Sequence, residues 1–136
     1  FHEAKLKKKG EVQCWGTGRP RREFLHVEDL AEAALFVLEK WDINSDSAPR
    51  TKNGDKLSFL NVGTGKDISI KELALLISNI FEYEGKIYWD HSKPDGTPKK
   101  LLDISRIKKM GWVPKIEFKD GLRSTIEVYK REFKIT

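Results

Sequence analysis

The chain has 136 residues, enough for one domain with a hydrophobic core, and its apolar fraction of 38% lies in the globular range. Charged residues make up 35% of the chain, which indicates a well-solvated surface rather than disorder, and the formal net charge of +5 favours anionic partners. A run of about 18 apolar residues, an apolar leader and a second cysteine are all absent, so we expect no membrane span, no secretion signal and no intrachain disulfide, and we expect a cytoplasmic protein.

The first part of the chain predicts a strand, a turn and a helix. Residues 12–15 suit a short strand, which the glycines and proline of residues 16–20 break into a turn. Residues 23–27 look extended, and Asp29 with Glu32 resembles a capping box that opens a helix. Apolar residues at helical spacing predict a buried face on this helix. They are Leu30, Ala33, Ala34, Val37, Leu38 and Trp41.

A polar segment and an α/β unit come next. Residues 43–57 lack an apolar period, which predicts a mobile surface loop. Residues 59–62 form a short apolar run that is typical of a strand buried on both faces. A glycine turn and a capping box of Ser69 with Glu72 lead from this run into a second helix.

The last part of the chain adds a strand, a loop and two helices. Residues 86–90 are typical of a strand, and residues 91–100 of an irregular loop with two prolines. Residues 105–110 predict a short helix, and about 119–133 predict the final one. This order of elements indicates a mixed α/β fold.

Two loops carry features that packing alone does not explain. Residues 15–22 (WGTGRPRR) and 93–100 (KPDGTPKK) each combine cations with a turn glycine and proline. Arginine forks and lysine charges suit phosphate oxygens, and Asp95 offers acceptors to sugar or ribose hydroxyls. From the residues alone, a pocket for a diphosphate-linked nucleotide sugar, solvated basic loops and nucleic-acid contact all remain open.

Other candidate groups favour structural roles. The G-x-G-x-x-G fingerprint and the P-loop are absent, and Gly63-Thr64-Gly65 lacks a third glycine, which favours a tight turn over a phosphate contact. His26 lies in an apolar segment and Cys14 alternates with an apolar residue, so we expect both to be packed rather than catalytic. No metal-ligand spacing occurs, and we expect no metal.

Three runs of this sequence resemble a known family. WGTGRPRREFLHVEDLAEAALFVLE, LNVGTGKDISIKELA and DHSKPDGTPKKLLDISRIKKMGW are similar to the C-terminal third of GDP-L-fucose synthases, which belong to the extended short-chain dehydrogenase/reductase (SDR) superfamily. Within the first two runs, residues 22–29 (REFLHVED) and 61–65 (NVGTG) resemble segments that recur across many nucleotide-sugar epimerases and dehydratases, whereas KPDGTPKKLLD is much more particular to the fucose synthases. The chain also begins with Phe1 rather than Met, so we expect a piece of a longer protein.

The resemblance implies an α/β fold that is the C-terminal substrate-binding portion of an extended SDR (Rossmann) enzyme, with the N-terminal dinucleotide-binding part absent. Residues 1–136 would form that portion, and the strand–helix unit at about 58–82 would join the Rossmann sheet. The implied activity is the NADPH-dependent 3,5-epimerisation and 4-reduction of GDP-4-keto-6-deoxy-D-mannose to GDP-L-fucose. This segment alone is expected to be inactive.

The family's substrate-binding residues carry over onto Trp15, Arg22, Asp95 and Lys100. Arg22 and Lys100 would meet the diphosphate, Asp95 would bind a sugar or ribose hydroxyl, and Trp15 would line the nucleotide side. No catalytic and no cofactor-binding residue is assigned to this chain, so NADPH would be bound mainly by the missing part. The expected partner is the GDP-sugar, without nucleic acid or membrane, and the parent enzyme is expected to be a homodimer.

Three alternatives remain. The first is another nucleotide-sugar epimerase or dehydratase of the same superfamily. The second is a basic nucleic-acid-binding module, although exposed aromatic platforms interleaved with the basic residues are lacking. The third is a non-catalytic scaffold that keeps a vestigial sugar-nucleotide pocket.

Overall fold

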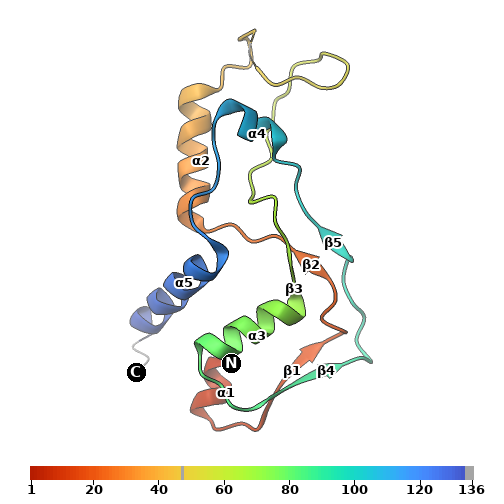
Figure 1. Ribbon diagram of the computed structural model, residues 1–136, viewed down its shortest axis with the longest axis vertical. Coiled ribbons are helices and arrows are strands. Elements are labelled where there is room, and N and C mark those ends of the chain that lie inside the picture. Colours follow the sequence, from red (N-terminus) through yellow and green to blue (C-terminus); the bar gives the residue numbers. More distant parts are fainter. Residues whose placement is uncertain (47, 134–136) are drawn as a thin grey trace. The chain divides into compact units, whose positions relative to one another are not determined.

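The computed structural model describes residues 1–46 and 48–133, and its elements confirm the predicted mixed α/β class (Figure 1). The chain forms two compact units, each made of two sequence segments: residues 1–23 with 66–101, and residues 24–65 with the segment from Leu102 onward. In chain order the elements are α1 (His2–Leu6), β1 (Glu11–Trp15), β2 (Arg21–Arg22), α2 (Val27–Lys40), β3 (Ile68–Ser69), α3 (Ile70–Ile80), β4 (Lys86–Asp90), β5 (Lys99–Lys100), α4 (Ser105–Met110) and α5 (Phe118–Glu132).

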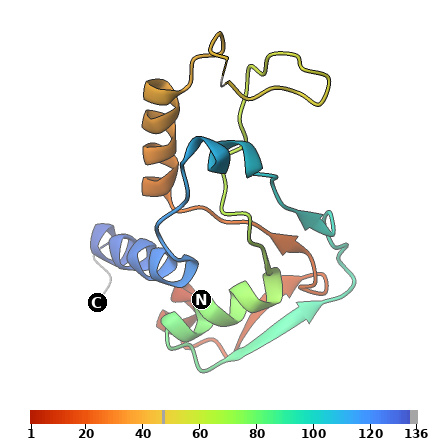
Figure 2. The ribbon, with the colours of Figure 1, turned by 45° about the horizontal axis from the view of Figure 1, so that its top comes forward.

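The first unit contains two small sheets. Strands β1 and β4 are parallel, in a register that runs from Glu11 opposite Lys86 to Trp15 opposite Asp90, and they lie side by side in Figures 1 and 2. In the second sheet β2 is the central strand, antiparallel to β3 and parallel to β5. The strands predicted over residues 12–15 and 86–90 are therefore confirmed, with β1 starting one residue earlier.

Helix α3 begins as its sequence predicts. Ser69 Oγ accepts a hydrogen bond from Glu72 N at 3.1 Å, and the Glu72 carboxylate accepts one from Ser69 N at 2.9 Å, which completes the capping box. Beyond its other end, the buried Tyr83 donates its hydroxyl to the Lys9 carbonyl at 2.9 Å. The capping box thus closes the start of α3, and the Tyr83 hydroxyl ties the segment after the helix to the segment before β1.

The second unit has its core between α2 and the α4 region. Its buried residues are Ala33, Ile104, Ile107 and Trp112, with Leu25, Phe36, Val37 and Val62 packed against them. Helix α4 has the predicted bounds, and α5 begins one residue before its predicted start. An added Cβ at Gly121 of α5 would lie 2.9 Å from the His26 ring, so only glycine fits there.

The predicted start of α2 is wrong. The helix begins at Val27, and its N-cap is His26, whose Nδ1 accepts a hydrogen bond from Glu28 N at 3.3 Å. Asp29 does not cap the helix: it is only 2% exposed and accepts from Lys115 N at 3.1 Å and Ile116 N at 3.0 Å. Its carboxylate satisfies the backbone of a distant segment, a role that local spacing does not reveal.

The predicted buried face of α2 is also only partly correct. Ala33 is fully buried and Val37 packs on the core, but Leu38 is 82% exposed. The helix packs through a narrower face than its apolar spacing indicates, and the remainder forms an exposed apolar surface. This surface, which we call the α2 stripe, contains Val27, Leu30, Ala31, Ala34, Leu35 and Leu38.

The predicted strand over residues 59–62 is wrong for this chain. None of the strands among the described residues includes or pairs with this run, and Phe59 is 60% exposed. A strand buried on both faces needs a sheet to pair with and layers that cover both faces of that sheet, and the described residues provide no sheet that includes this run. The extended segment predicted at 23–27 ends one residue early, because His26 is extended but Val27 is already helical, and the strand β2 covers residues 21–22 before it.

The predicted loops are observed with two additions. The described residues of the loop at 43–57 contain turns and one bridge between Arg50 and Lys56. Ser47 lies outside the described residues, and the mobility of the loop stays a prediction. The loop at 91–100 ends in β5. Among the helices of the described residues, none combines the length and apolarity that crossing a membrane requires.

Candidate functional site

The structure brings the two predicted basic loops together within the first unit. Strands β2 and β5 pair in parallel, with Arg21 opposite Lys99 and Arg22 opposite Lys100. The backbone N–H of Arg21 donates to the Pro98 carbonyl at 2.8 Å. The loops 15–22 and 93–100 are therefore neighbours along much of their length, as a shared binding site requires.

Asp95 ties one loop to the other through Thr17. Its Oδ1 accepts from Thr17 N at 2.8 Å and its Oδ2 from Thr17 Oγ1 at 2.6 Å. These two hydrogen bonds lower the pKa of the Asp95 carboxyl, because they stabilise its charged form. Gly16 permits the approach: its φ is +74°, and an added Cβ would lie 2.2 Å from Asp95 Oδ1. Asp95 thus holds the loops together in addition to any contact with a ligand.

Arg22 is also anchored to the opposite loop. Its Nη1 donates to the carbonyls of Arg21 and Thr97, both at 2.7 Å. An added Cβ at Gly96 would lie 3.2 Å from Arg22 Nη2, so the guanidinium passes close to the backbone of the loop. These contacts fix the direction of the guanidinium plane, which carries five donor hydrogens in all.

Trp15 stands at the end of β1 with 71% of its surface exposed. The ammonium of Lys93 lies 5.7 Å from the centre of the Trp15 ring, which is a cation–π distance. An exposed indole beside a cation offers a flat apolar surface for an aromatic base. The other tryptophan of this unit, Trp89, is half-buried on β4.

The β2–β5 ladder separates the cations by face. Residues directly opposite each other in a sheet share a face, and successive residues of a strand alternate. Arg21 and Lys99 therefore share one face, and Arg22 and Lys100 share the other. Within the described residues, neither Arg22 nor Lys100 forms an ion pair, whereas Arg21 and Lys99 both pair with Asp67. The Arg22–Lys100 face therefore carries uncompensated positive charge.

Cys14 and His26, the two residues predicted to be packed rather than catalytic, lie outside loops 15–22 and 93–100. Cys14 is half-buried on β1, and burial raises the pKa of its thiol, which makes it a poor nucleophile. His26 lies in the second unit as the cap of α2. No group of three or more potential metal ligands gathers among residues 1–46 and 48–133.

Sequence reasoning missed Thr17 and Asp67. Thr17 lies 78 residues from Asp95, and Asp67 lies 46 residues from Arg21. Neither has a local pattern that indicates its partner. A polar residue next to a turn glycine, as Thr17 is, is the only signal that the sequence offers.

The second unit contains a separate cavity of about 630 Å³ beside the end of α2 and α4. Its lining includes Trp41, Arg50, Asp103 and Arg106. None of the four predicted site residues contributes to it, and its mixture of basic and acidic side chains selects no class of ligand.

Comparisons with known proteins agree with the resemblance found in the motifs. Residues 1–48 match the NAD dependent epimerase/dehydratase family. Over 130 residues the chain is 47% identical to a probable GDP-L-fucose synthase 1 of Oryza sativa subsp. japonica, a match that covers 96% of this chain and 35% of that protein. It is 44% identical over 131 residues to a GDP-L-fucose synthase of Escherichia coli K12, covering 93% of this chain and 38% of that protein.

A solved structure extends the comparison to the fold. The GDP-mannoheptose C4 reductase MlghC from Campylobacter jejuni, with NADP bound, matches with a TM-score of 0.74 and 38% identity, over 95% of this chain and 40% of that one. The chain thus spans between about a third and two fifths of these relatives. Similarity to fucose synthases and to the extended SDR fold is confirmed, for a part of such a protein.

Proposed function

We propose that this chain, which is related to the GDP-L-fucose synthases of the extended SDR superfamily, is the GDP-sugar-binding part of such an enzyme. The parent enzyme epimerises GDP-4-keto-6-deoxy-D-mannose at C3 and C5 and reduces C4 with NADPH. The observation that carries the proposal is the pairing of β2 with β5, which sets Arg22 and Lys100 side by side on one face. The chain has this pair in segments that align with proteins named GDP-L-fucose synthase.

In this proposal Arg22 and Lys100 bind the diphosphate. The arginine fork matches two phosphate oxygens, and the lysine supplies a mobile point charge. A diphosphate carries more than one negative charge, so two adjacent cations without an acidic partner suit it. The backbone anchors of Arg22 reduce the entropy that the side chain loses on binding.

Trp15 and Asp95 complete the proposed site. The exposed Trp15 ring stacks on the guanine, and Lys93 limits its motion. An ionised carboxylate accepts about four hydrogen bonds. Asp95 uses two of them for Thr17, which leaves capacity for a sugar or ribose hydroxyl.

The catalytic groups and most of the NADPH site belong to the part of the parent enzyme outside this chain. NADPH supplies the hydride for the reduction at C4, and the residues of this chain bind the GDP moiety and so orient the sugar. We propose that residues 58–82 join the Rossmann sheet there. The run at 59–62 supports this, because it is mostly apolar, Phe59 is 60% exposed, and none of the strands among the described residues pairs with it. The homodimer and the cytoplasmic location belong to the same proposal.

A second candidate is a reductase that acts on another GDP-linked sugar. The similarity to the GDP-mannoheptose C4 reductase, at 38% identity, supports it. In both candidate functions this chain recognises GDP. They differ in the sugar, which the part of the parent enzyme outside this chain would largely select. A nucleic-acid module has less support, because loops 15–22 and 93–100 contain a single aromatic residue, Trp15, among their cations.

The test is an activity assay on the full-length protein encoded by the same gene. We expect NADPH oxidation with GDP-4-keto-6-deoxy-D-mannose and none with a UDP-linked ketosugar. In deuterated water, the product should carry deuterium at C3 and C5, because epimerisation exchanges those protons with solvent. NADPH oxidation without this exchange would favour the simple reductase, and no oxidation with any GDP-ketosugar would refute both.

A further inference from the structure

We propose that Asp67 is a positioning residue: it sets the register of the β3–β2–β5 sheet and so determines which two of four cations face the nucleotide diphosphate. The inference rests on the proposed function, since it concerns the same site. Asp67 itself lies on the other side of the ladder from the proposed ligand.

The sheet contains two cationic doublets that are chemically ambiguous. Strand β2 is Arg21-Arg22 and strand β5 is Lys99-Lys100. Either arginine and either lysine could supply a phosphate-binding pair, because the two members of each doublet are identical in type. A shift of one residue exchanges the two faces of a strand. Sequence composition therefore does not decide which pair is presented.

Asp67 resolves this ambiguity by binding one member of each doublet. Its Oδ1 accepts from Arg21 Nε at 2.6 Å, and its backbone carbonyl accepts from Arg21 Nη2 at 3.1 Å. Its Oδ2 lies 3.1 Å from Lys99 Nζ. Both cations of one face are thus held by a single residue, which leaves Arg22 and Lys100 on the other face.

The position of Asp67 makes this interaction specific. Its side chain is only 9% exposed with Arg21 and Lys99 in place, so the two cations replace much of its hydration. It directly precedes β3 and the capped start of α3, which fix its backbone. Glu72 of that capping box adds a weaker ion pair to Arg21 at 3.7 Å. The acceptor group is therefore rigid, whereas the arginine and lysine stems are flexible.

The register of this sheet depends on side-chain contacts because its strands are very short. Each of the three strands has two residues, fewer than in ordinary strands. Few backbone hydrogen bonds therefore fix the register, among them Arg21 N to Pro98 O at 2.8 Å and Ile70 N to Pro20 O at 2.9 Å. Side-chain pairing has a correspondingly larger share in selecting one register.

The experiment compares variants of the full-length protein by calorimetric titration with GDP and by thermal unfolding. Asp67→Asn keeps the shape and removes the charge, so the doublets lose their common anchor. We expect GDP affinity to fall by roughly tenfold, the scale of a displaced binding group, while NADPH affinity stays unchanged. Asp29→Asn is the matched control, because it replaces a more deeply buried carboxylate of the other unit. It should lower the melting temperature and leave GDP affinity unchanged.

A double variant separates positioning from general stability. Arg21→Gln should weaken GDP binding like Asp67→Asn, and the combined variant should be no weaker than either single one, because both remove the same anchor. Additive losses, or unchanged GDP affinity in Asp67→Asn, would overturn the proposal. If Asp67→Asn does not fold, Lys99→Gln decides instead: it removes the exposed partner, and unchanged GDP affinity would likewise overturn it. A wild-type protein that does not bind GDP refutes the proposed function itself.

Discussion

At the scale of single residues, the candidate site depends on the difference between neighbouring cations. Arg21 and Arg22 are adjacent and identical in type, yet Arg21 pairs with Asp67. Arg22 instead donates to the carbonyls of Arg21 and Thr97 and forms no ion pair within the described residues. The ion pair raises the pKa of Arg21, and hydrogen bonding to Arg21 lowers the pKa of Asp67. Arg22 is thus the arginine whose charge is available to an anion.

Arg22→Ala in the full-length protein should weaken GDP binding by about 1.5–3 kcal/mol, the scale of a charge-assisted hydrogen-bonded contact. Calorimetric titration measures the change. Arg19→Ala is the control, because Arg19 is exposed in the same loop and the substitution changes the net charge equally. Equal losses in both variants would indicate a diffuse electrostatic effect, and an unchanged affinity in Arg22→Ala would contradict the assigned role.

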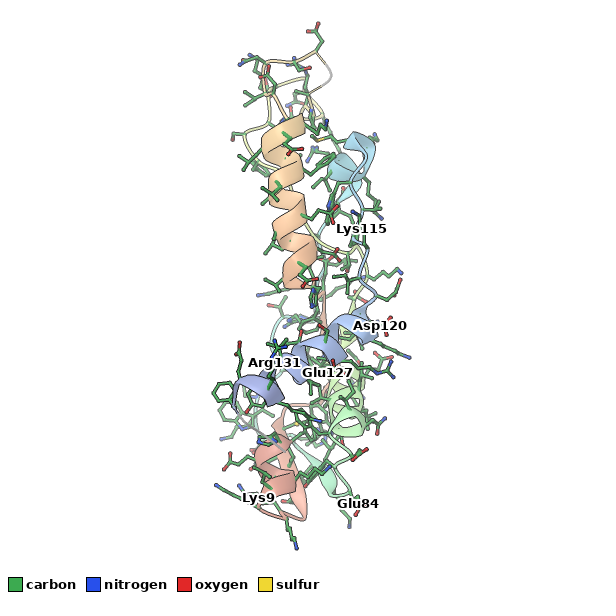
Figure 3. All side chains as sticks on the ribbon, turned by 90° about the vertical axis from the view of Figure 1, so that its left-hand side faces the viewer. Lys9, Glu84, Lys115, Asp120, Glu127 and Arg131 are labelled. Atoms are coloured by element: carbon green, nitrogen blue, oxygen red, sulfur yellow. The ribbon has the colours of Figure 1, made fainter. Side chains whose placement is uncertain are left out.

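Asp29→Asn should lower the free energy of unfolding by about 1–3 kcal/mol, because one of two part-buried backbone donors loses its acceptor and the other keeps only an uncharged one. Those donors are Lys115 N and Ile116 N. Denaturant titration measures the loss. The control is Glu32→Gln, which breaks an exposed ion pair with Lys115, the partner that Figure 3 labels. That change should cost less than about 1 kcal/mol. A smaller effect for Asp29→Asn than for the control would contradict the structural role.

At the scale of elements, the two site loops are joined by a carboxylate whose charge matters. The pKa of Asp95 is lowered in the folded protein, mainly by its hydrogen bonds with Thr17. Its contribution to stability is therefore complete above the unfolded-state pKa, near 3.8, and is lost as the pH falls through the lower folded-state value.

The predicted consequence is a pH-dependent difference between wild type and Asp95→Asn, in which asparagine resembles the protonated acid. The wild type should melt at a higher temperature near neutral pH, and the difference should shrink below about pH 4. Comparing the two proteins cancels the other carboxylates, which titrate in both. A melting-temperature difference that stays constant between neutral pH and pH 3 would show that the charge of Asp95 does not stabilise the fold.

How far the sequence predicts these elements depends on the range of the interactions that form them. The bounds of α4 and the capping box of α3 are local, and both are confirmed. Strands β2 and β5 were not predicted as strands, because two residues show no alternation and their pairing spans 78 residues. The start of α2 was predicted wrongly for a similar reason: Asp29 accepts hydrogen bonds from backbone N–H groups that lie 86 and 87 residues away in the sequence. The residue types in the two loops indicated the site. Which side chains pair with one another could be seen only in the folded structure.

At the scale of the whole molecule, the exposed α2 stripe is the clearest sign of a missing partner surface. Helix α5, in contrast, carries charged residues on its exposed side, among them Asp120, Glu127 and Arg131, which Figure 3 labels. A contiguous apolar surface on a helix is typical of an interface. Since the chain spans 35% of a relative that is 47% identical, the remainder of the parent protein is the proposed occupant.

Leu38→Lys tests this interface, because its effect depends on context. In the full-length protein the substitution should lower the free energy of unfolding by about 2 kcal/mol or more, since it buries a charge. In the isolated chain, where Leu38 is 82% exposed, it should instead reduce self-association, as light scattering would show. Glu39→Lys, on the exposed polar side of α2, is the control. Destabilisation by Leu38→Lys no larger than in this control would contradict an interface at the stripe.

The most direct test of the account is a calorimetric titration of the wild-type full-length protein with GDP and, separately, with UDP. We expect saturable GDP binding and much weaker UDP binding, because Arg22 and Lys100 bind the diphosphate while Trp15 contacts the base. The same titration of Arg22→Ala should show weakened GDP binding. Equal binding of both nucleotides would contradict GDP recognition by this site, and absence of binding to either would contradict the central claim.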